Sequence, residues 1–441
     1  MRARRSKPVG EAAAAPSGSA TVRRLRFLTD WRILATLLVL QFAVIVVLTF
    51  WPNSPSRPLP RAGYSSRVWE PYFAGHPGPW GELEYVRINI EPPEAFLPSG
   101  DYRFEPTRWF FEGLDPGAVK SILDRSDLTP AQRATLVDST AWLVESNGIT
   151  LTPGADLILE LSASARAGIY RVLARSPRNE FQHWPYSYRG NGFQDWFSQS
   201  GLSPATMQLV SRLVYQRGGA LCFSDLPELG AKIEAGPERR RLLKALFRKS
   251  GLLMKLRVRP DTDTEKLVDY WGSGGRAKDF RPLLESLTHV EGSISIDVAH
   301  LLPPFARKRV NTYPAPPANP NQEGADCYWT AMNFFNDPPD DRYFDETYWN
   351  AELEANYAII EQPGFGDLVF LLLPDGKPIH AAVYIADEVV FTKNGIQLRQ
   401  PWLLMKMEDM LAAYPEDQQL RVVYFRLKSR SGGAPPPART P

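Results

Sequence analysis

Cysteine and histidine are scarce in this chain of 441 residues, which contains two cysteines and five histidines. Two cysteines do not make the disulfide framework of a small secreted domain. His183, His289 and His300 have no H-x-x-x-H, C-x-x-C or carboxylate spacing around them, so the sequence indicates no metal site, and it implies no cofactor. We interpret these three histidines as structural.

An excess of charge of one sign is also missing. The chain has 51 Lys and Arg against 49 Asp and Glu, and eight of the basic and two of the acidic residues precede Ile33. The remainder is near neutral and has no basic stripe interleaved with aromatic residues, which argues against nucleic acid as a partner. A glycine-rich loop at 271–278 (W-G-S-G-G-R-A-K) lacks the strand-to-helix setting of a phosphate-binding loop, so nucleotide binding is not indicated.

One long apolar run is present, at residues 33–51. These 19 uncharged residues are enough for a helix to cross a hydrocarbon core about 30 Å thick. The basic residues before the run predict that the N-terminal tail, residues 1–32, stays in the cytoplasm and that the rest of the chain lies outside a bacterial inner membrane. A cleaved signal peptide is the alternative, but the run is longer than the usual apolar core of a signal, and W-P-N-S-P-S lacks a small-x-small cleavage site.

Two segments of low complexity flank the expected domains. Residues 52–105 begin with a proline-stiffened stalk and contain one alternating segment, Leu83–Ile90, that predicts a strand without indicating its partner. Residues 429–441 are rich in serine, glycine and proline, and we expect them to be disordered.

The region 106–290 is predicted to be all-helical. Two dipeptides, each an N-cap followed by a proline at the first helical position, mark helix starts 74 residues apart: Thr129-Pro130 and Ser203-Pro204. The same offset relates segment 164–176 to segment 238–250 without a gap. We interpret this as a degenerate duplication that forms a platform for recognition, with chance similarity of amphipathic helices as the alternative.

Cys327 is the most informative residue. It lies in G-A-D-C-Y-W-T-A-M-N-F-F, where Gly324 and Asp326 mark a helix start and place the thiol in the first turn. Free backbone N–H groups at such a position favour a thiolate, so we expect a lowered pKa for Cys327. A disulfide with Cys222, which the pattern otherwise marks as an ordinary buried residue, is the competing interpretation.

A thiolate needs a base, and His380 follows at the start of a predicted strand. Cysteine first and strand-borne histidine second is the order of papain-like hydrolases. The other elements that we expect around the pair are strands at 367–373, 380–385, 389–393 and 420–427 and a helix near 403–414.

This constellation resembles the NlpC-like cell-wall peptidase family over residues 295–428. Three segments carry the resemblance: Asp326-Cys327, P-G-F-G-D-L-V-F at 363–370, and H-A-A-V-Y-I-A-D at 380–387. The resemblance implies that Cys327 is the nucleophile, that His380 is the base, and that a polar residue on the next strand orients the imidazole.

The family's third position falls at Thr392, where His, Asn or Gln is expected. Strand alternation puts Thr392 and Asn394 on one face, and Asn394 reaches the ring after a small register shift. We favour Asn394 over Thr392, because its side-chain carbonyl can accept from an imidazole N–H.

Tyr328 and Trp329 depart from the family's usual Ser-Gly after the cysteine. We expect these aromatic residues to line the substrate side of the site. Asp326 has a simpler interpretation, as the cap of the helix.

The predicted architecture is thus a membrane-anchored chain with one N-terminal transmembrane helix, an all-helical middle at 106–290 and a C-terminal α+β papain-like domain with an antiparallel sheet at 291–428. The expected function is that of an extracytoplasmic cysteine hydrolase, with an amide bond of peptidoglycan peptides as the substrate. Two alternatives stay open: a thiol acyltransferase or lipid amidase on the same fold, and a non-catalytic envelope scaffold. The sequence leaves the oligomeric state undetermined.

Overall fold

The structure is a computed structural model that describes residues 73–97, 105–234, 236–316, 324–414 and 419–430. Among the helices of these ranges, none combines the length and the apolar character needed to cross a bilayer. Three predicted segments lie outside the described residues, wholly or for the most part: the cytoplasmic tail at 1–32, the transmembrane helix at 33–51 and the C-terminal tail at 429–441.

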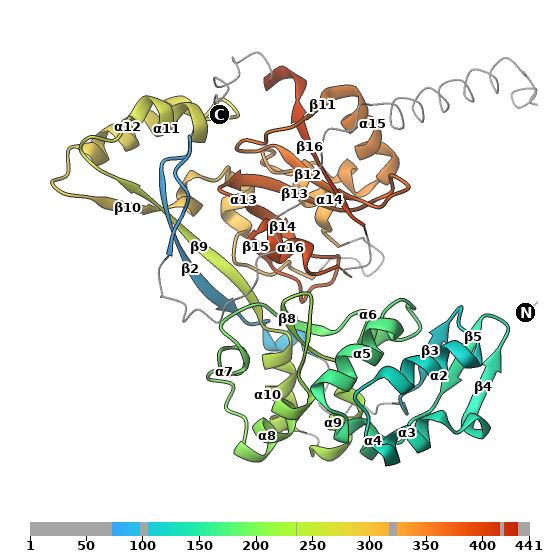
Figure 1. Ribbon diagram of the computed structural model, residues 1–441. Helices are drawn as coiled ribbons and strands as arrows, with labels where there is room; N and C mark the ends of the chain where they lie inside the picture. Colours follow the sequence, from blue (N-terminus) through green and yellow to red (C-terminus); the bar gives the residue numbers. More distant parts are fainter. Residues whose placement is uncertain (1–72, 98–104, 235, 317–323, 415–418, 431–441) are drawn as a thin grey trace, which may run out of the picture. The chain divides into compact units, whose positions relative to one another are not determined.

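The predicted strand at 83–90 is present and belongs to a four-stranded antiparallel sheet (Figure 1). Its partner is the long strand β9, in which Leu252, Met254, Leu256 and Val258 are buried alternately. The sheet order is β1 (Phe73–Ala74), β2 (Glu82–Ile90), β9 (Lys249–Val258) and β10 (Ile294–Asp297). Helices α11 (Thr264–Trp271) and α12 (Ala277–Thr288) lie between β9 and β10 in the chain, and η1 (Glu94–Phe96) follows β2.

Two consecutive units make up the middle of the chain and share one order of strands and helices, apart from η2 in the first and α6 at the start of the second. The first contains β3 (Trp109–Glu112), α2 (Pro116–Arg125), α3 (Pro130–Val137), η2 (Ser139–Ala141), β4 (Trp142–Glu145), β5 (Gly148–Leu151), α4 (Ala155–Glu160) and α5 (Ala163–Leu173). The second contains α6 (Glu180–His183), β6 (Tyr186–Tyr188), α7 (Phe193–Trp196), α8 (Pro204–Leu213), β7 (Tyr215–Arg217), β8 (Ala220–Phe223), α9 (Leu226–Lys232) and α10 (Pro237–Leu246).

Each unit has its own three-stranded antiparallel sheet, in the orders β3-β5-β4 and β6-β8-β7. In both units the last strand lies in the centre, so the two sheets have the same topology. The helix starts at Pro130 and Pro204 are confirmed, with Thr129 and Ser203 as N-caps. The common order of helices and strands supports a duplication.

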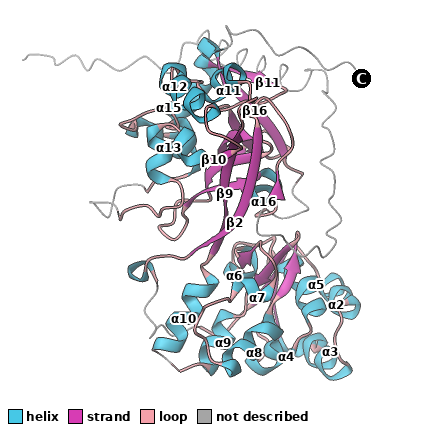
Figure 2. Ribbon diagram, turned by 90° about the vertical axis from the view of Figure 1, so that its left-hand side faces the viewer, coloured by secondary structure: helices cyan, strands magenta, loops and turns pink. Residues whose placement is uncertain are grey.

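The predicted all-helical middle region, and with it the predicted fold class, is wrong, because strands and helices are mixed between residues 106 and 290 (Figure 2). Short segments such as G-I-T-L and A-L-C-F are too brief for a clear alternation, and they become strands because they pair with neighbours in the fold. The sequence of β9 does indicate a strand, because its buried residues recur with a period of two.

A buried ion pair links the two units. Arg166 of α5, fully buried, donates from Nε to Asp225 at 2.6 Å, and Tyr170 donates from its hydroxyl to the same carboxylate at 2.6 Å. Other guanidinium N–H groups of Arg166 donate to the carbonyls of Ile158 and Arg212. Removing one member of such a pair leaves a buried charge without its partner, which typically costs about 3–5 kcal/mol.

The C-terminal region is an antiparallel six-stranded sheet in the order β11-β16-β12-β13-β14-β15. Its strands are β11 (Tyr357–Ile360), β12 (Leu368–Leu372), β13 (Pro378–Ala386), β14 (Val389–Lys393), β15 (Trp402–Lys406) and β16 (Arg421–Leu427). Its helices are η3 (Val298–Leu301), α13 (Pro304–Arg309), α14 (Cys327–Met332), η4 (Asp341–Phe344), α15 (Glu346–Asn356), α16 (Met407–Leu411) and η5 (Lys428–Arg430). The predicted helix near 403–414 is therefore a strand followed by a short helix.

The sheet has a buried core on each face. Val383 and Phe391 share one core with Trp329 of α14, so α14 covers that face. Val390 belongs to a separate core with Met407 and Met410, which α16 contributes to the other face. The functional site is assembled around the strands between these two helices.

Candidate functional site

Cys327 is the first residue of α14 (Figure 1), as predicted from the sequence. The carboxylate of Asp326 accepts a hydrogen bond from the backbone N–H of Trp329 at 2.7 Å. This contact confirms Asp326 as the N-cap, because it satisfies one of the N–H groups that a helix start leaves without a partner.

The Cys327 thiol is buried and free, with 6% of the residue exposed. Cys222 is also a free thiol, so the alternative of a Cys222–Cys327 disulfide is wrong. Burial, followed by the negative charge of Asp326, raises the pKa of Cys327 to about 12. The expected lowering of this pKa is therefore wrong: the N–H groups of Cys327, Tyr328 and Ala381 act in the expected direction, but desolvation outweighs them.

His380 lies on β13 and is 1% exposed. Burial lowers the pKa of its imidazole to about 4, so the ring is neutral at pH 7. Nε2 of the ring lies 2.8 Å from Oγ1 of Thr392, which is also buried. The resting site therefore holds a neutral thiol and a neutral imidazole.

A chain of hydrogen bonds sets the tautomer of His380. The Thr392 hydroxyl donates to Oδ1 of Asn394 at 3.3 Å, so its oxygen is left to accept from Nε2–H of the imidazole. The proton then resides on Nε2, and Nδ1 carries the lone pair that a general base needs. Nδ2 of Asn394 is 3.7 Å from the sulfur of Met405.

The direct partner of the imidazole is thus Thr392 rather than the favoured Asn394, which acts one hydrogen bond further away. β13, which carries His380, pairs with β14 with an irregularity between Tyr384 and Ala386, and in this arrangement the Thr392 hydroxyl is the group that contacts the ring. Both residues predicted for the third position are connected to His380.

Thiol and imidazole approach the same part of β13. The pairing of β13 with β14 ends at Val383 and Phe391. Two residues before Val383 on β13, the backbone N–H of Ala381 faces the Cys327 sulfur. His380 is the neighbour of Ala381, and strand alternation places it on the face that α16 covers. The hydrogen bonds between described residues include none from Cys327 to His380.

The two aromatic residues after the cysteine pack inward. Trp329 is 5% exposed, stacks on Phe344 at 5.2 Å between ring centroids, and donates from Nε1 to Asp341. Tyr328 stacks on Trp349 at 4.5 Å. The expected place of Trp329 on a substrate-facing surface therefore does not match the structure, which makes it a core residue, whereas Tyr328 is only partly buried.

Tyr414 is a neighbour of the site that the sequence did not indicate. It follows α16, and its ring centroid is 5.9 Å from that of His380. Burial, followed by the charge of Cys327, raises the pKa of its phenol. The sequence gave no signal for this contact, because a tyrosine at the end of a short helix is common and the contact joins segments 34 residues apart in the chain.

Lys393, at the end of β14, is a second residue that was missed. It is fully buried, and Nζ donates to the carbonyl oxygens of Gly395 at 2.5 Å and Gln397 at 3.1 Å. A lysine that ends a predicted strand is usually solvated, so only the fold shows that it is enclosed.

Other sites of binding are not apparent near the pair. Within the part of the chain that the structure describes, His, Cys, Asp and Glu side chains do not gather in groups of three that could hold a metal ion. A shallow recess lined by residues 335–343 includes none of the predicted site residues. Comparison of the chain with models of protein families, with curated proteins and with solved structures found no match.

Proposed function

We propose that the C-terminal region is a cysteine hydrolase that cleaves an amide bond, with Cys327 as nucleophile and His380 as general base. The observation that carries the proposal is the chain His380–Thr392–Asn394, which engages Nε2 and leaves Nδ1 of the imidazole to act as a base, on the residue next to Ala381, whose backbone N–H faces the Cys327 sulfur. The resemblance to NlpC-like peptidases, which rests on three motifs of the sequence, gives the same two residues these roles.

The reaction needs two steps. Nδ1 of His380 takes the proton of the thiol, and the thiolate attacks the amide carbonyl carbon. The tetrahedral intermediate collapses when the C–N bond breaks, and the imidazolium returns its proton to the leaving amine. Water, deprotonated by the imidazole, then cleaves the thioester and restores the thiol.

The backbone N–H groups of Cys327 and Tyr328 are suited to stabilise the oxyanion, because they lie at the start of α14 beside the sulfur. Peptide amides of peptidoglycan are the first substrates to test. This choice rests on the family resemblance and on the predicted location outside the cytoplasmic membrane, which stays a prediction. A thiol acyltransferase or lipid amidase would use the same residues and differ only in substrate.

A non-catalytic scaffold is the second candidate, and the burial of the site favours it. With 6% of Cys327 and 1% of His380 exposed, a substrate cannot reach the pair unless the site opens. Catalysis therefore requires a movement that a scaffold would not need.

Alkylation of the native full-length protein by iodoacetamide at pH 7 separates the two candidates, with the modified peptides quantified by mass spectrometry. If the pair is catalytic, Cys327 reacts faster than Cys222, and His380→Ala lowers its rate by about 10²-fold or more, the usual contribution of a general base. Cys222 is the internal control for global unfolding. A Cys327 rate equal to that of Cys222 and indifferent to His380→Ala would favour the scaffold.

Release of amines from purified peptidoglycan peptides then tests the substrate. Turnover is expected in the wild type and in Cys222→Ala and is expected to be lost in Cys327→Ala. Cleavage that persists in Cys327→Ala would overturn the proposed nucleophile.

A further inference from the structure

Lys393 lies next to Thr392 in the chain but on the opposite face of the sheet. Val389 and Phe391, which share its alternation along β14, pack in the core that α14 covers. The strand neighbour of Lys393 is Trp402, whose Nε1 donates to Oγ1 of Thr330 in α14 at 3.0 Å. The ammonium group is therefore enclosed on the side from which Cys327 comes.

The loop after β14 is tied together by this ammonium group. Nζ donates to the carbonyls of Gly395 and Gln397, so it closes the turn at 394–397. Ile396 of the same turn lies close to Gly324, in the segment that leads into α14. The approach is so close that a Cβ on Gly324 would be 3.2 Å from the carbonyl oxygen of Ile396. The turn also begins with Asn394, which accepts from Thr392. One buried cation thus braces a loop that contacts both halves of the site.

The charge of Lys393 is not neutralised by its two acceptors, since both are carbonyl oxygens. An ammonium group has three N–H donors, and the hydrogen bonds of the described residues account for two of them. The ionisable groups that face it are Asp326 and Cys327, and both oppose the lowering of its pKa to about 8 that burial causes. On the neighbouring strand, His380 is neutral and occupies the other face.

We propose that Lys393 is a positioning residue of the Cys327–His380 pair, which holds the 394–397 loop against the start of α14 and favours the Cys327 thiolate by its positive charge. This inference rests on the proposed hydrolase function and extends it. When the proton passes from Cys327 to His380, the negative charge that forms on sulfur gains a cation in a dry surrounding, where charges interact more strongly than in water.

The test measures the alkylation rate of Cys327 against pH in the full-length protein, for the wild type, Lys393→Met and Lys393→Arg. Methionine comes close to the length of the lysine side chain and lacks its charge, so the rate at pH 7, where Lys393 is protonated, should fall about tenfold. Arginine keeps the charge, so the rate of Lys393→Arg at pH 7 should stay close to that of the wild type. A Lys393→Met rate at pH 7 equal to that of the wild type would overturn the inference.

Lys249→Met is the matched control, because Lys249 is a partly buried lysine whose pKa is lowered to about 8 by burial and which faces Cys222. It should leave the Cys327 profile unchanged. An equal fall of the Cys327 rate at pH 7 in both methionine variants would mean that the effect is general loosening, which would also overturn the inference.

Lys393→Arg keeps the test decisive if Lys393→Met does not fold, which thermal melting would show. A rise in pH past about 8 removes the charge of Lys393 but not that of arginine, so the wild-type rate should level off there while the variant's rate continues to rise. Coincident profiles would contradict the role of the charge. A Cys327 rate that does not depend on His380 would instead mean that the proposed hydrolase function fails, whatever Lys393 does.

Discussion

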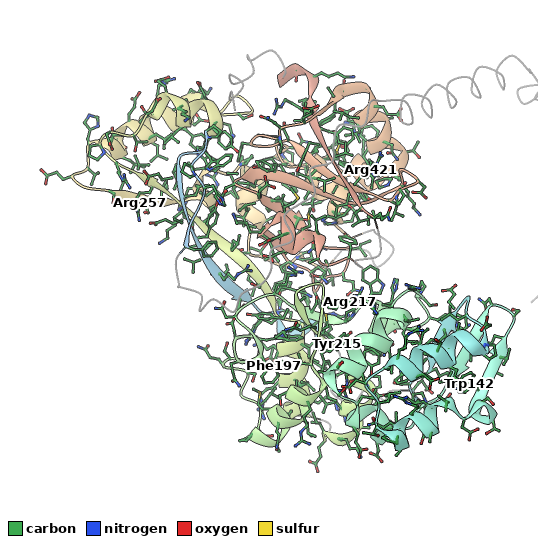
Figure 3. The ribbon with its side chains drawn as sticks, in the orientation of Figure 1. Trp142, Phe197, Tyr215, Arg217, Arg257 and Arg421 are labelled. Atoms are coloured by element: carbon green, nitrogen blue, oxygen red, sulfur yellow. The ribbon has the colours of Figure 1, made fainter. Side chains whose placement is uncertain are left out.

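Cys222 and Cys327 are both buried free thiols, yet they differ in the backbone around them. Cys222 lies on β8, the central strand of its sheet, between Ser187 and Tyr215 of the two neighbouring strands. Figure 3 labels Tyr215 and Arg217 on one of these strands. Cys327 is instead the first residue of a helix, beside the point where two strands stop pairing.

Judged by nearby charges alone, Cys222 rather than Cys327 would be expected to have the lowered pKa. Arg217, Arg189 and Lys249 all act to lower the pKa of Cys222, but burial raises it to about 11. Asp326 acts in the opposite direction on Cys327, after burial, and that pKa is raised to about 12. The difference that matters is therefore the presence of a base: His380 is next to Ala381, whose backbone N–H faces the Cys327 sulfur, whereas Cys222 lies in a separate core, in the middle of the chain.

The largest effect that we expect is a loss of stability in acid. It arises from His380, the proposed partner of Cys327, and it has no equivalent at Cys222. His380 has a pKa of about 4 when folded against 6.5 in the unfolded chain. Between these values only the unfolded chain takes up the proton, so stability falls as the pH drops through 6.5, and the loss is complete near pH 4, at about 3 kcal/mol.

Urea unfolding of the wild type and His380→Gln at pH 7 and pH 4 measures this difference. Carboxylates contribute equally in both proteins, so the wild type should lose more stability on acidification than the variant. Equal losses would mean that the imidazole is not held neutral in the folded state.

A smaller effect is expected from the partner of the imidazole. Thr392→Val keeps the shape of the side chain but removes the acceptor for Nε2–H, so the Cys327 alkylation rate should fall about tenfold, as for the loss of one hydrogen bond. Asn394→Ala should have a weaker effect because it acts through Thr392, and Cys222 should be unaffected. A larger loss in Asn394→Ala than in Thr392→Val would reverse this order of roles.

The smallest effect that we expect is an increase in the alkylation rate of Cys327. Tyr414→Ala removes the ring that packs near His380, so alkylation of Cys327 should become about fivefold faster, which corresponds to about 1 kcal/mol. Tyr414→Phe, which keeps the ring, is the matched control and should not change the rate. Unchanged alkylation in Tyr414→Ala would show that another group limits access to the thiol.

The helix that precedes Tyr414, α16, is held in place by contacts with distant segments of the chain. Asp409 of α16 is 5% exposed and accepts hydrogen bonds from Arg87 of β2 at 3.1 Å and from Arg189 at 3.3 Å. These contacts fix α16 to other parts of the chain, so they also hold Tyr414 near the site.

Signals within a few residues were reliable in the sequence. The cap and proline pairs at Thr129 and Ser203 predicted two helix starts correctly, Asp326 predicted the start of α14, and the alternation in 389–393 predicted β14 with the observed bounds. These features work locally, because a cap satisfies N–H groups of its own helix and alternation reflects the two faces of one strand.

Signals that depend on distant partners were not reliable. The middle region was predicted to be helical, but β9 forms because it pairs with β2, more than 150 residues away in the chain. Residues 402–406 form a strand for the same reason, since β14 offers them an edge. Lys393 and Tyr414 could not have been placed near the thiol, because each is brought there by packing.

The sequence by itself determined which residues we propose for the chemistry: a thiol at a helix start, a histidine on a strand, and two polar side chains on the next strand. The tertiary structure alone decided that Thr392 rather than Asn394 contacts the imidazole, because the contact joins side chains of two strands, β13 and β14, whose relative placement is set by the fold. It also decided the resting state of the pair. The helix start favours a thiolate, but burial of Cys327 and His380 favours the neutral forms of both, and burial is a property of the whole fold.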